Sequence, residues 1–189
     1  MPGLGDLIKQ APTHKRRMEV TSYPLDDGRL IAEGWLLDER FNSGFHWSGN
    51  ERPPGVIHHL RLRLLIGGWP LTIQEAEAEM LGVPTEYCRE IKDSVKKVEG
   101  VPIVHGYSDE VRRRLDGIEG CNHLTHLLVV MGPAALHGYW TMRSRQKQPR
   151  PKKLEDVPGL SYLVDSCWVW RKNGPLVERM RQALSQEEG

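Results

Sequence analysis

Apolar and polar residues alternate along the first half of the chain, which is the pattern of strands that bury one face. Two such runs lie between Arg17 and Asp38, and Asp27 and Gly28 separate them. An Asp-Gly pair is a strong turn signal between two strands. The segment therefore predicts a β-hairpin.

A second hairpin follows a long loop at residues 41–55, which is rich in Gly, Asn, Ser and Pro. Beyond this loop, the segments VIHHLRLRLLI and LTIQEAEAEM show strand-like patterns and are joined by Gly67 and Gly68. In the first of them leucines alternate with arginines, so one face is expected to be buried and the other exposed. We expect the two hairpins to form one antiparallel sheet.

Helical periodicity replaces the alternation after Pro84. In PTEYCREIKDSVKKVEG the apolar residues share one helical face, and Thr85 is the predicted N-cap. A second helix is predicted in YSDEVRRRLDGIEG, capped by Ser108 and ended by Gly120. The third begins within GCNHLTHLL and continues through LTHLLVVMGPAALHGYWTMR, where Pro133 is expected to kink or interrupt it.

The order of strands first and helices afterwards predicts an α+β fold, with N-terminal antiparallel β-hairpins forming one sheet and a helical layer packed on it. Residues 1–16 are expected to be a flexible arm, and residues 17–189 a single domain. Within that domain, residues 144–159 are rich in Pro, Lys and Arg and predict a surface loop. The segment LSYLVDSCWVW near the end is expected to be a strand.

Composition excludes several classes of function. The 26 basic and 25 acidic residues nearly balance, which argues against a nucleic-acid partner. No apolar run reaches the roughly 20 residues that span a bilayer, and none near the N-terminus has signal-peptide length. Three cysteines fit free or metal-bound thiols in a reducing compartment, so we expect a cytoplasmic protein. Glycine-rich phosphate-binding motifs are missing, so no nucleotide cofactor is expected.

The stretch GCNHLTHLL carries the most reactive side chains of the chain, at the start of an apolar helix. If Gly120 ends one helix, Cys121 or Asn122 caps the next. A thiol at a helix N-terminus faces unpaired N–H groups, which stabilise the thiolate, and His123 lies within reach of the same space. A buried cysteine beside capping or core histidines is the alternative.

Other candidate residues are dispersed. Cys88 lies on the apolar stripe of the first predicted helix, where core packing is the stronger local explanation. Asp165 and Cys167 are two residues apart and would share a face of a strand, although a single buried cysteine explains them equally well. His46 and Trp47 lie in the 41–55 loop, and loops of this length are often functional.

Four stretches together are similar to the bacterial domain of unknown function 2889 family: HHLRLRLLIGGWPLTIQEAEAEM, VPTEYC, LDGIEGCNHLTHLL and LVDSCWVWRKNGPLV. The resemblance implies that all three cysteines, with His123 and Asp165, occupy positions where the family pattern has the same residue. The chain departs from that pattern at His126, at Trp168 and near Gly67. The family name implies no activity. The architecture is also similar, more distantly, to iron–sulfur scaffolds of the NifU type.

Three hypotheses follow. The first is a metal site for zinc or an iron–sulfur cluster, with His123 or Asp165 as fourth ligand to Cys88, Cys121 and Cys167. The second is a metal-free enzyme with Cys121 as nucleophile or acid, His123 as base and Asp165 orienting it. The third is a non-catalytic accessory or binding subunit with a protein partner or a second copy.

A small-molecule ligand is compatible with the first two hypotheses. His46, Trp47 and Trp168 are the predicted substrate-binding residues, because tryptophan walls suit a hydrophobic or aromatic organic compound. The sequence does not decide whether the protein is an enzyme.

Overall fold

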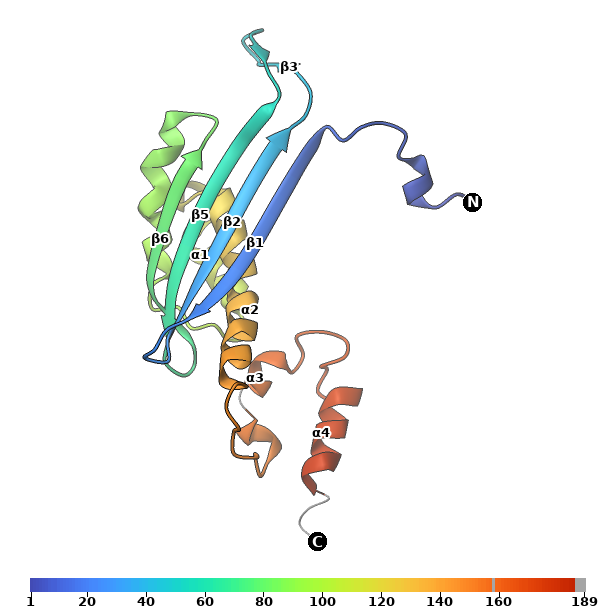
Figure 1. Ribbon diagram of the computed structural model, residues 1–189, viewed down its shortest axis with the longest axis vertical. Helices are drawn as coiled ribbons and strands as arrows, with labels where there is room; N and C mark the ends of the chain where they lie inside the picture. The colour runs from blue at the N-terminus through green and yellow to red at the C-terminus, as the bar shows by residue number, and fades with distance from the viewer. Residues whose placement is uncertain (158, 186–189) are drawn as a thin grey trace.

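The strands predicted from the alternating pattern form one antiparallel sheet with the order β1-β2-β5-β6 (Figure 1). The computed structural model describes residues 1–157 and 159–185. The strands are β1 (His14–Pro24), β2 (Leu30–Arg40), β5 (Gly55–Gly67) and β6 (Thr72–Gly82). Between β2 and β5, a small separate hairpin joins β3 (Gly44–Phe45) to β4 (Glu51–Arg52).

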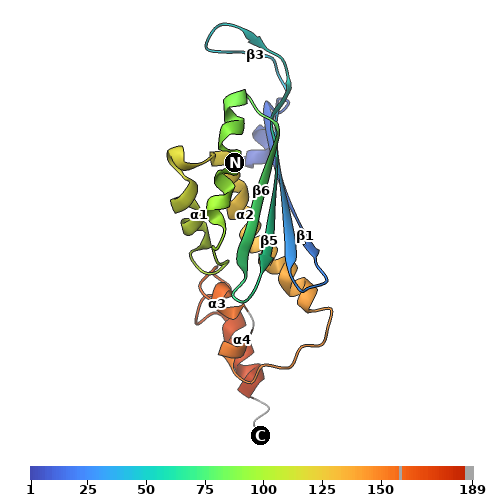
Figure 2. The same ribbon diagram turned by 90° about the vertical axis from the view of Figure 1, so that its left-hand side faces the viewer.

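The helical layer follows in sequence and covers one face of the sheet (Figure 2). Its members are the 3-10 helix η2 (Glu86–Val98), α1 (Tyr107–Leu115), the short turn η3 (Gly117–Glu119) and the long helix α2 (Asn122–Arg143). After α2 come η4 (Leu154–Asp156), α3 (Leu160–Leu163) and α4 (Pro175–Ser185), and a turn of 3-10 helix, η1 (Leu4–Leu7), precedes the sheet. The predicted α+β class, with an N-terminal antiparallel sheet followed by a helical layer, is confirmed.

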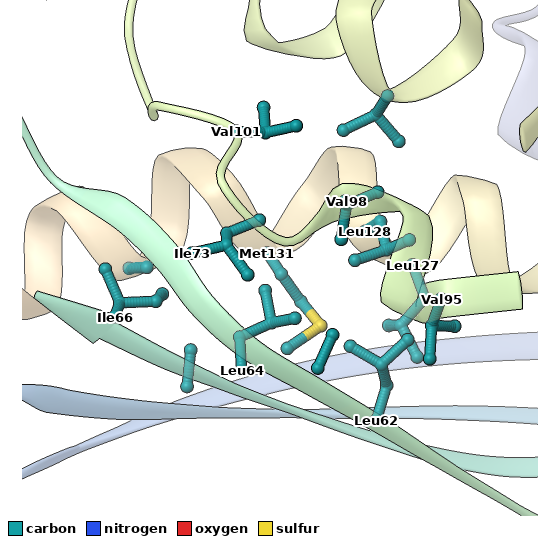
Figure 3. Close-up of a cluster of buried hydrophobic side chains, with 14 of the residues drawn as sticks. Leu62, Leu64, Ile66, Ile73, Val95, Val98, Val101, Leu127, Leu128 and Met131 are labelled. Carbon is teal, nitrogen blue, oxygen red and sulfur yellow. The ribbon is translucent and has the colours of Figure 1, made fainter. Parts of the chain in front are cut away.

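The core lies between the sheet and these helices. Alternate residues of the two central strands point toward the helices and are almost completely buried: Leu30, Ala32 and Leu36 on β2, and Leu60, Leu62, Leu64 and Ile66 on β5. Figure 3 shows several of them meeting side chains of η2 and α2, among them Val95, Val98, Leu127 and Met131. Burial of this apolar surface is the main source of stability.

Two glycines set how closely α2 approaches the sheet. A Cβ atom added at Gly34 of β2 would lie 2.6 Å from the sulfur of Met131, and one added at Gly138 of α2 would lie 2.3 Å from Ser22 Oγ. Side chains at these two positions would push the helix away from β1 and β2. The close contacts at Gly34 and Gly138 therefore hold α2 against the strands at two points of the helix. As a result, the first turn of α2 lies over one end of the sheet.

Several local predictions need correction. The chain after Gly159 is not a strand: it forms α3 and then a series of turns, and Asp165 has a positive φ of 61°. The first predicted helix is a 3-10 helix, and Gly106 rather than Ser108 is the N-cap of α1. Pro133 lies inside α2, which continues to Arg143.

Two predicted boundaries can be compared with the structure. Strand β1 begins at His14, so the last residues of the predicted 1–16 arm belong to the sheet. The predicted loop at 144–159 contains bends and the short turn η4, and its residue 158 lies outside the described residues. Within the described ranges, no helix is both long and apolar enough to cross a membrane.

Candidate metal centre

A row of three polar residues crosses the helix-facing side of the sheet near one end. Arg16 of β1 is the register partner of Asp38 on β2, and Asp38 is the partner of His58 on β5. Each strand places alternate residues on the same face, so Asp38 and His58 continue the buried positions of Leu36 and Leu60. The β2–β5 register shifts directly after Asp38, which makes this row the last regular one before a bulge.

The first turn of α2 brings His123 to this row. Cys121 is the N-cap of α2, as one of the two sequence-based assignments predicted, and His123 follows within the first turn. The imidazole of His123 lies against that of His58, with ring centroids 3.8 Å apart and planes inclined by 33°. A helix and two strands therefore contribute to one cluster.

Asp38, His58 and His123 have the spacing of a metal-binding group. One ligand atom from each can be chosen so that all lie within 4.8 Å of one another. Asp38 Oδ2 is 3.0 Å from His58 Nδ1 and 3.8 Å from His123 Nε2. The Asp38 side chain is only 3% exposed, whereas those of His58 and His123 are 15% and 23% exposed. The cluster is therefore sheltered but remains accessible from the histidine side.

Arg16 keeps the buried carboxylate of Asp38 charged. Its Nε and Nη2 atoms donate hydrogen bonds of 2.6 Å to Oδ1 and Oδ2. These bonds to Arg16, with smaller contributions from its charge and from His58, hold the pKa of Asp38 below its usual value, although burial acts in the opposite direction. His14 Nε2 lies 3.5 Å from the same carboxylate. At neutral pH Asp38 is therefore an anion available to a cation.

His123 is neutral at the same pH. Burial lowers the pKa of its imidazole to about 4, because charging the ring there costs solvation, and the nearby His58 and Arg16 add to the effect. The Asp38 carboxylate only partly offsets it. A neutral imidazole has one nitrogen lone pair free, which is the form that binds metals.

The cysteine ligand set predicted from the sequence does not come together. Among the described residues, the one group with metal-binding spacing is Asp38, His58 and His123, and it contains no cysteine. Cys121 approaches that group but contacts His123 Nδ1, with its Sγ atom 3.9 Å away. Cys88 is partly buried and packs against the hydrophobic core from η2, and Cys167 is exposed.

The length of α2 explains why Cys121 and Cys167 are apart. Cys121 begins this helix of 22 residues, which spans about 33 Å at the usual rise per residue. Cys167 follows α3, which lies near the other end of α2 in Figure 1. A metal ion holds its sulfur ligands at about 2.3 Å, so it cannot bridge the two.

The remaining candidates lie apart from the cluster. Asp165 shares the turn region with Cys167 and accepts a hydrogen bond of 2.8 Å from the backbone N–H of Lys172. Trp168 is 73% exposed and stacks under the guanidinium of Arg171. His46 and Trp47 contact each other in the β3–β4 hairpin, which extends beyond the end of the sheet (Figure 1).

Asp38 and His58 were not among the site residues predicted from the sequence. For Asp38 a signal existed: it continues the series Leu30, Ala32, Gly34 and Leu36 on the buried face of β2, and a carboxylate in such a position needs a partner. For His58 the signal is weaker, because side chains alternate along a strand and only one residue of the His58-His59 pair can face inward. The register that pairs the two residues was not visible in the sequence.

The comparisons with known proteins identify a family. Residues 14–137, well over half of the chain, match the family described as "Protein of unknown function (DUF2889)", so the chain belongs to this family. The matched region includes Arg16, Asp38, His58, Cys121 and His123, and it ends before Asp165 and Cys167. Neither the curated proteins nor the solved structures give a match.

Proposed function

We propose that this DUF2889 protein binds a zinc ion through Asp38, His58 and His123. One observation carries the proposal: three side chains with metal-ligand atoms come from two strands and a helix and lie within 4.8 Å of one another. Zinc bonds to nitrogen and oxygen are about 2.0–2.2 Å long, so ligand atoms around one ion lie roughly 3–4 Å apart. One ligand atom of each residue already lies within 4.8 Å of the other two, so small side-chain adjustments suffice to reach that arrangement.

The donor set favours zinc or a neighbouring divalent transition metal. Imidazole nitrogens suit zinc, copper, iron and nickel, whereas magnesium and calcium prefer sites made entirely of oxygen. An iron–sulfur cluster, the other cofactor considered from the sequence, needs several thiolates, and the group of Asp38, His58 and His123 has none. We therefore propose a zinc ion and not an iron–sulfur cluster.

Three protein ligands leave at least one coordination position for water or a small molecule. Structural zinc sites usually have four protein ligands, and catalytic sites usually have three with an open position. Partial exposure of the two histidines gives a ligand access to that position. We propose that an organic small molecule binds there; a zinc ion held by these three residues would acidify a water molecule in the open position. All three cysteines are free thiols, which suits the reducing cytoplasm.

The test is a zinc titration of the full chain after treatment with a chelator. We expect one zinc ion per chain, and we expect His58→Ala and His123→Ala each to lower the affinity by about 100-fold or more, since even indirect partners of a metal are worth about 10–100-fold. His59→Ala is the matched control, because His59 is the adjacent residue on the opposite face, where its ring contacts that of Trp35. Absence of stoichiometric binding by the unaltered chain would show the proposal to be wrong.

A second candidate function is metal-free thiol chemistry. The His123 ring lies between Cys121 Sγ, 3.9 Å from Nδ1, and Asp38 Oδ2, 3.8 Å from Nε2. A cysteine, a histidine and a carboxylate in this order resemble a nucleophile, its base and an orienting group, with Asp38 in the role that the sequence analysis assigned to Asp165. Iodoacetamide labelling of chelator-treated protein tests it. This function requires Cys121 to react faster than Cys167, although Cys167 is the more exposed residue.

A further inference from the structure

His123 faces two different groups with its two ring nitrogens. Nε2 points toward the Asp38 carboxylate, at 3.8 Å, and Nδ1 toward the Cys121 sulfur, at 3.9 Å. A neutral imidazole carries a proton on one nitrogen and a lone pair on the other. The position of that proton decides which nitrogen can bind a metal.

Asp38 is a poor partner for a proton on Nε2. Its Oδ2 atom already accepts hydrogen bonds from Arg16 Nη2 at 2.6 Å and from His58 Nδ1 at 3.0 Å. Its Oδ1 atom accepts from Arg16 Nε at 2.6 Å. The remaining 3.8 Å separation from His123 Nε2 exceeds the usual range of an N–H···O bond, which ends at about 3.2 Å.

Cys121 is a suitable partner for a proton on Nδ1. Sulfur is larger than oxygen and accepts hydrogen bonds over longer distances. The Cys121 Sγ atom lies 3.9 Å from His123 Nδ1, and the tautomer of His123 decides which of the two donates. Cys121 has an extended backbone at the N-cap, and its carbonyl accepts hydrogen bonds from the Thr125 N–H and hydroxyl. Within the described part of the chain its side chain makes no capping bond to the helix, so the sulfur is available to His123.

We propose that Cys121 is a positioning residue that holds the His123 proton on Nδ1 and so presents the Nε2 lone pair to the metal. The inference rests on the proposed zinc site and assigns Nε2 as the ligand atom of His123. Groups that hydrogen-bond to the far nitrogen of a histidine ligand fix its tautomer and orientation. In this role Cys121 does not bind the metal itself.

The first experiment measures the tautomer in metal-free protein. Long-range ¹H–¹⁵N correlation spectra of the chelator-treated chain distinguish the two neutral tautomers of each histidine. The chain has eight histidines, so the His123 signals are assigned by their loss in His123→Gln. We expect protonated Nδ1 and unprotonated Nε2, and we expect Cys121→Ala to shift this balance. A proton on Nε2 in the unaltered chain would overturn the proposal and favour the thiol function.

The second experiment measures zinc affinity in Cys121 variants. We expect Cys121→Ala to lower the affinity by about 10–100-fold, as loss of a hydrogen-bond partner to a ligand does. Cys121→Ser keeps an acceptor and should retain part of the affinity. Since serine is also a favourable N-cap, a weaker helix cannot explain any loss that remains. Cys88→Ala is the control, because Cys88 packs against the core in η2 and should not affect binding.

The two proposals fail in different ways. If the unaltered chain does not bind zinc, the zinc site is wrong, and the assigned ligand role of Nε2 falls with it, whatever the tautomer. If it binds zinc and Cys121→Ala binds equally well with an unchanged tautomer, the zinc site stands and the positioning role of Cys121 is wrong.

Discussion

The two faces of the sheet carry charged rows with very different surroundings. On the helix-covered face, Asp38 lies between Arg16 and His58. On the open face, Arg63 lies between Glu33 on one neighbouring strand and Glu77 on the other, again as register partners. In both rows a charged residue has a partner of opposite charge on a neighbouring strand: Asp38 has Arg16, and Arg63 has Glu33 and Glu77.

Burial makes the difference between the rows. The side chains of Glu77, Arg63 and Glu33 are 66%, 30% and 16% exposed, so water reaches the open row, most of all at Glu77. The Asp38 side chain is 3% exposed, and the first turn of α2 adds His123 above it. Ion pairs on a surface contribute little, whereas a buried charge depends strongly on its partners. The same pattern thus forms a partly solvated row of ion pairs on the open face and a candidate metal site on the covered face.

The largest expected effect that separates the rows is on zinc affinity. Asp38→Asn removes the negative charge and one oxygen ligand while keeping the side-chain shape, and we expect the affinity to fall by about 100-fold or more. Glu77→Gln makes the same change on the open face and should leave the affinity unaltered. Isothermal titration calorimetry measures both. Equal losses in the two variants would mean that the net charge of the protein, and not the site, attracts the metal.

Substitutions in the two rows should also differ in their effect on the stability of the metal-free protein. Asp38→Asn leaves Arg16 without its counter-charge at a position that is partly buried, and we expect a loss of about 2–3 kcal/mol in the free energy of unfolding. The figure is below the range for fully buried pairs because the Arg16 side chain is 34% exposed. Urea titration at neutral pH measures it. An unchanged midpoint would mean that water replaces Asp38 as the partner of Arg16.

The pH dependence of stability should come mainly from the covered row. The pKa of His123 is about 4 in the folded protein and near 6.5 when the chain is unfolded. The unfolded chain therefore binds more protons between these values, so stability falls as the pH decreases from about 6.5, by about 2 kcal/mol at about pH 5. The lowered pKa of Asp38 acts in the same direction at still lower pH.

Thermal unfolding from about pH 7 to 5 checks this prediction. His123→Gln should lose less stability over the same range, because glutamine does not take up a proton. A variant with the full pH dependence of the unaltered chain would show that another group is responsible.

The smallest effect is expected on the open face. Glu77→Gln should change the urea midpoint by no more than the error of the measurement, because the side chain is largely exposed and Arg63 keeps Glu33 as a partner. The measurement is repeated in high salt, where screening weakens any remaining interaction. A clear loss of stability at high salt would mean that Glu77 contributes to stability despite its exposure. The two rows would then not differ in how strongly stability depends on their ion pairs.

The sequence by itself determined the local elements. The alternation around Leu60 and Leu62 predicted a strand with one buried face, and the Asp27-Gly28 turn predicted the first hairpin, because a strand and a tight turn depend on residues close in the chain. The same kind of local signal placed Cys121 at the start of α2. Local signals failed at Asp165: the segment around Cys167 has strand-like composition, but it pairs with no strand in the described part of the chain.

Only the tertiary structure decided which reactive groups meet. Asp38 and His58 become neighbours through the β2–β5 register, and His123 reaches them because Gly34 and Gly138 let α2 pack closely across the sheet. The local sequence around a cysteine or histidine does not show whether its side chain lies in a site or in the core. Its partners depend on strand register and on how the helix packs on the sheet, and both are determined by long-range packing of the whole core. Three residues scattered along the chain can therefore form one site without any local motif.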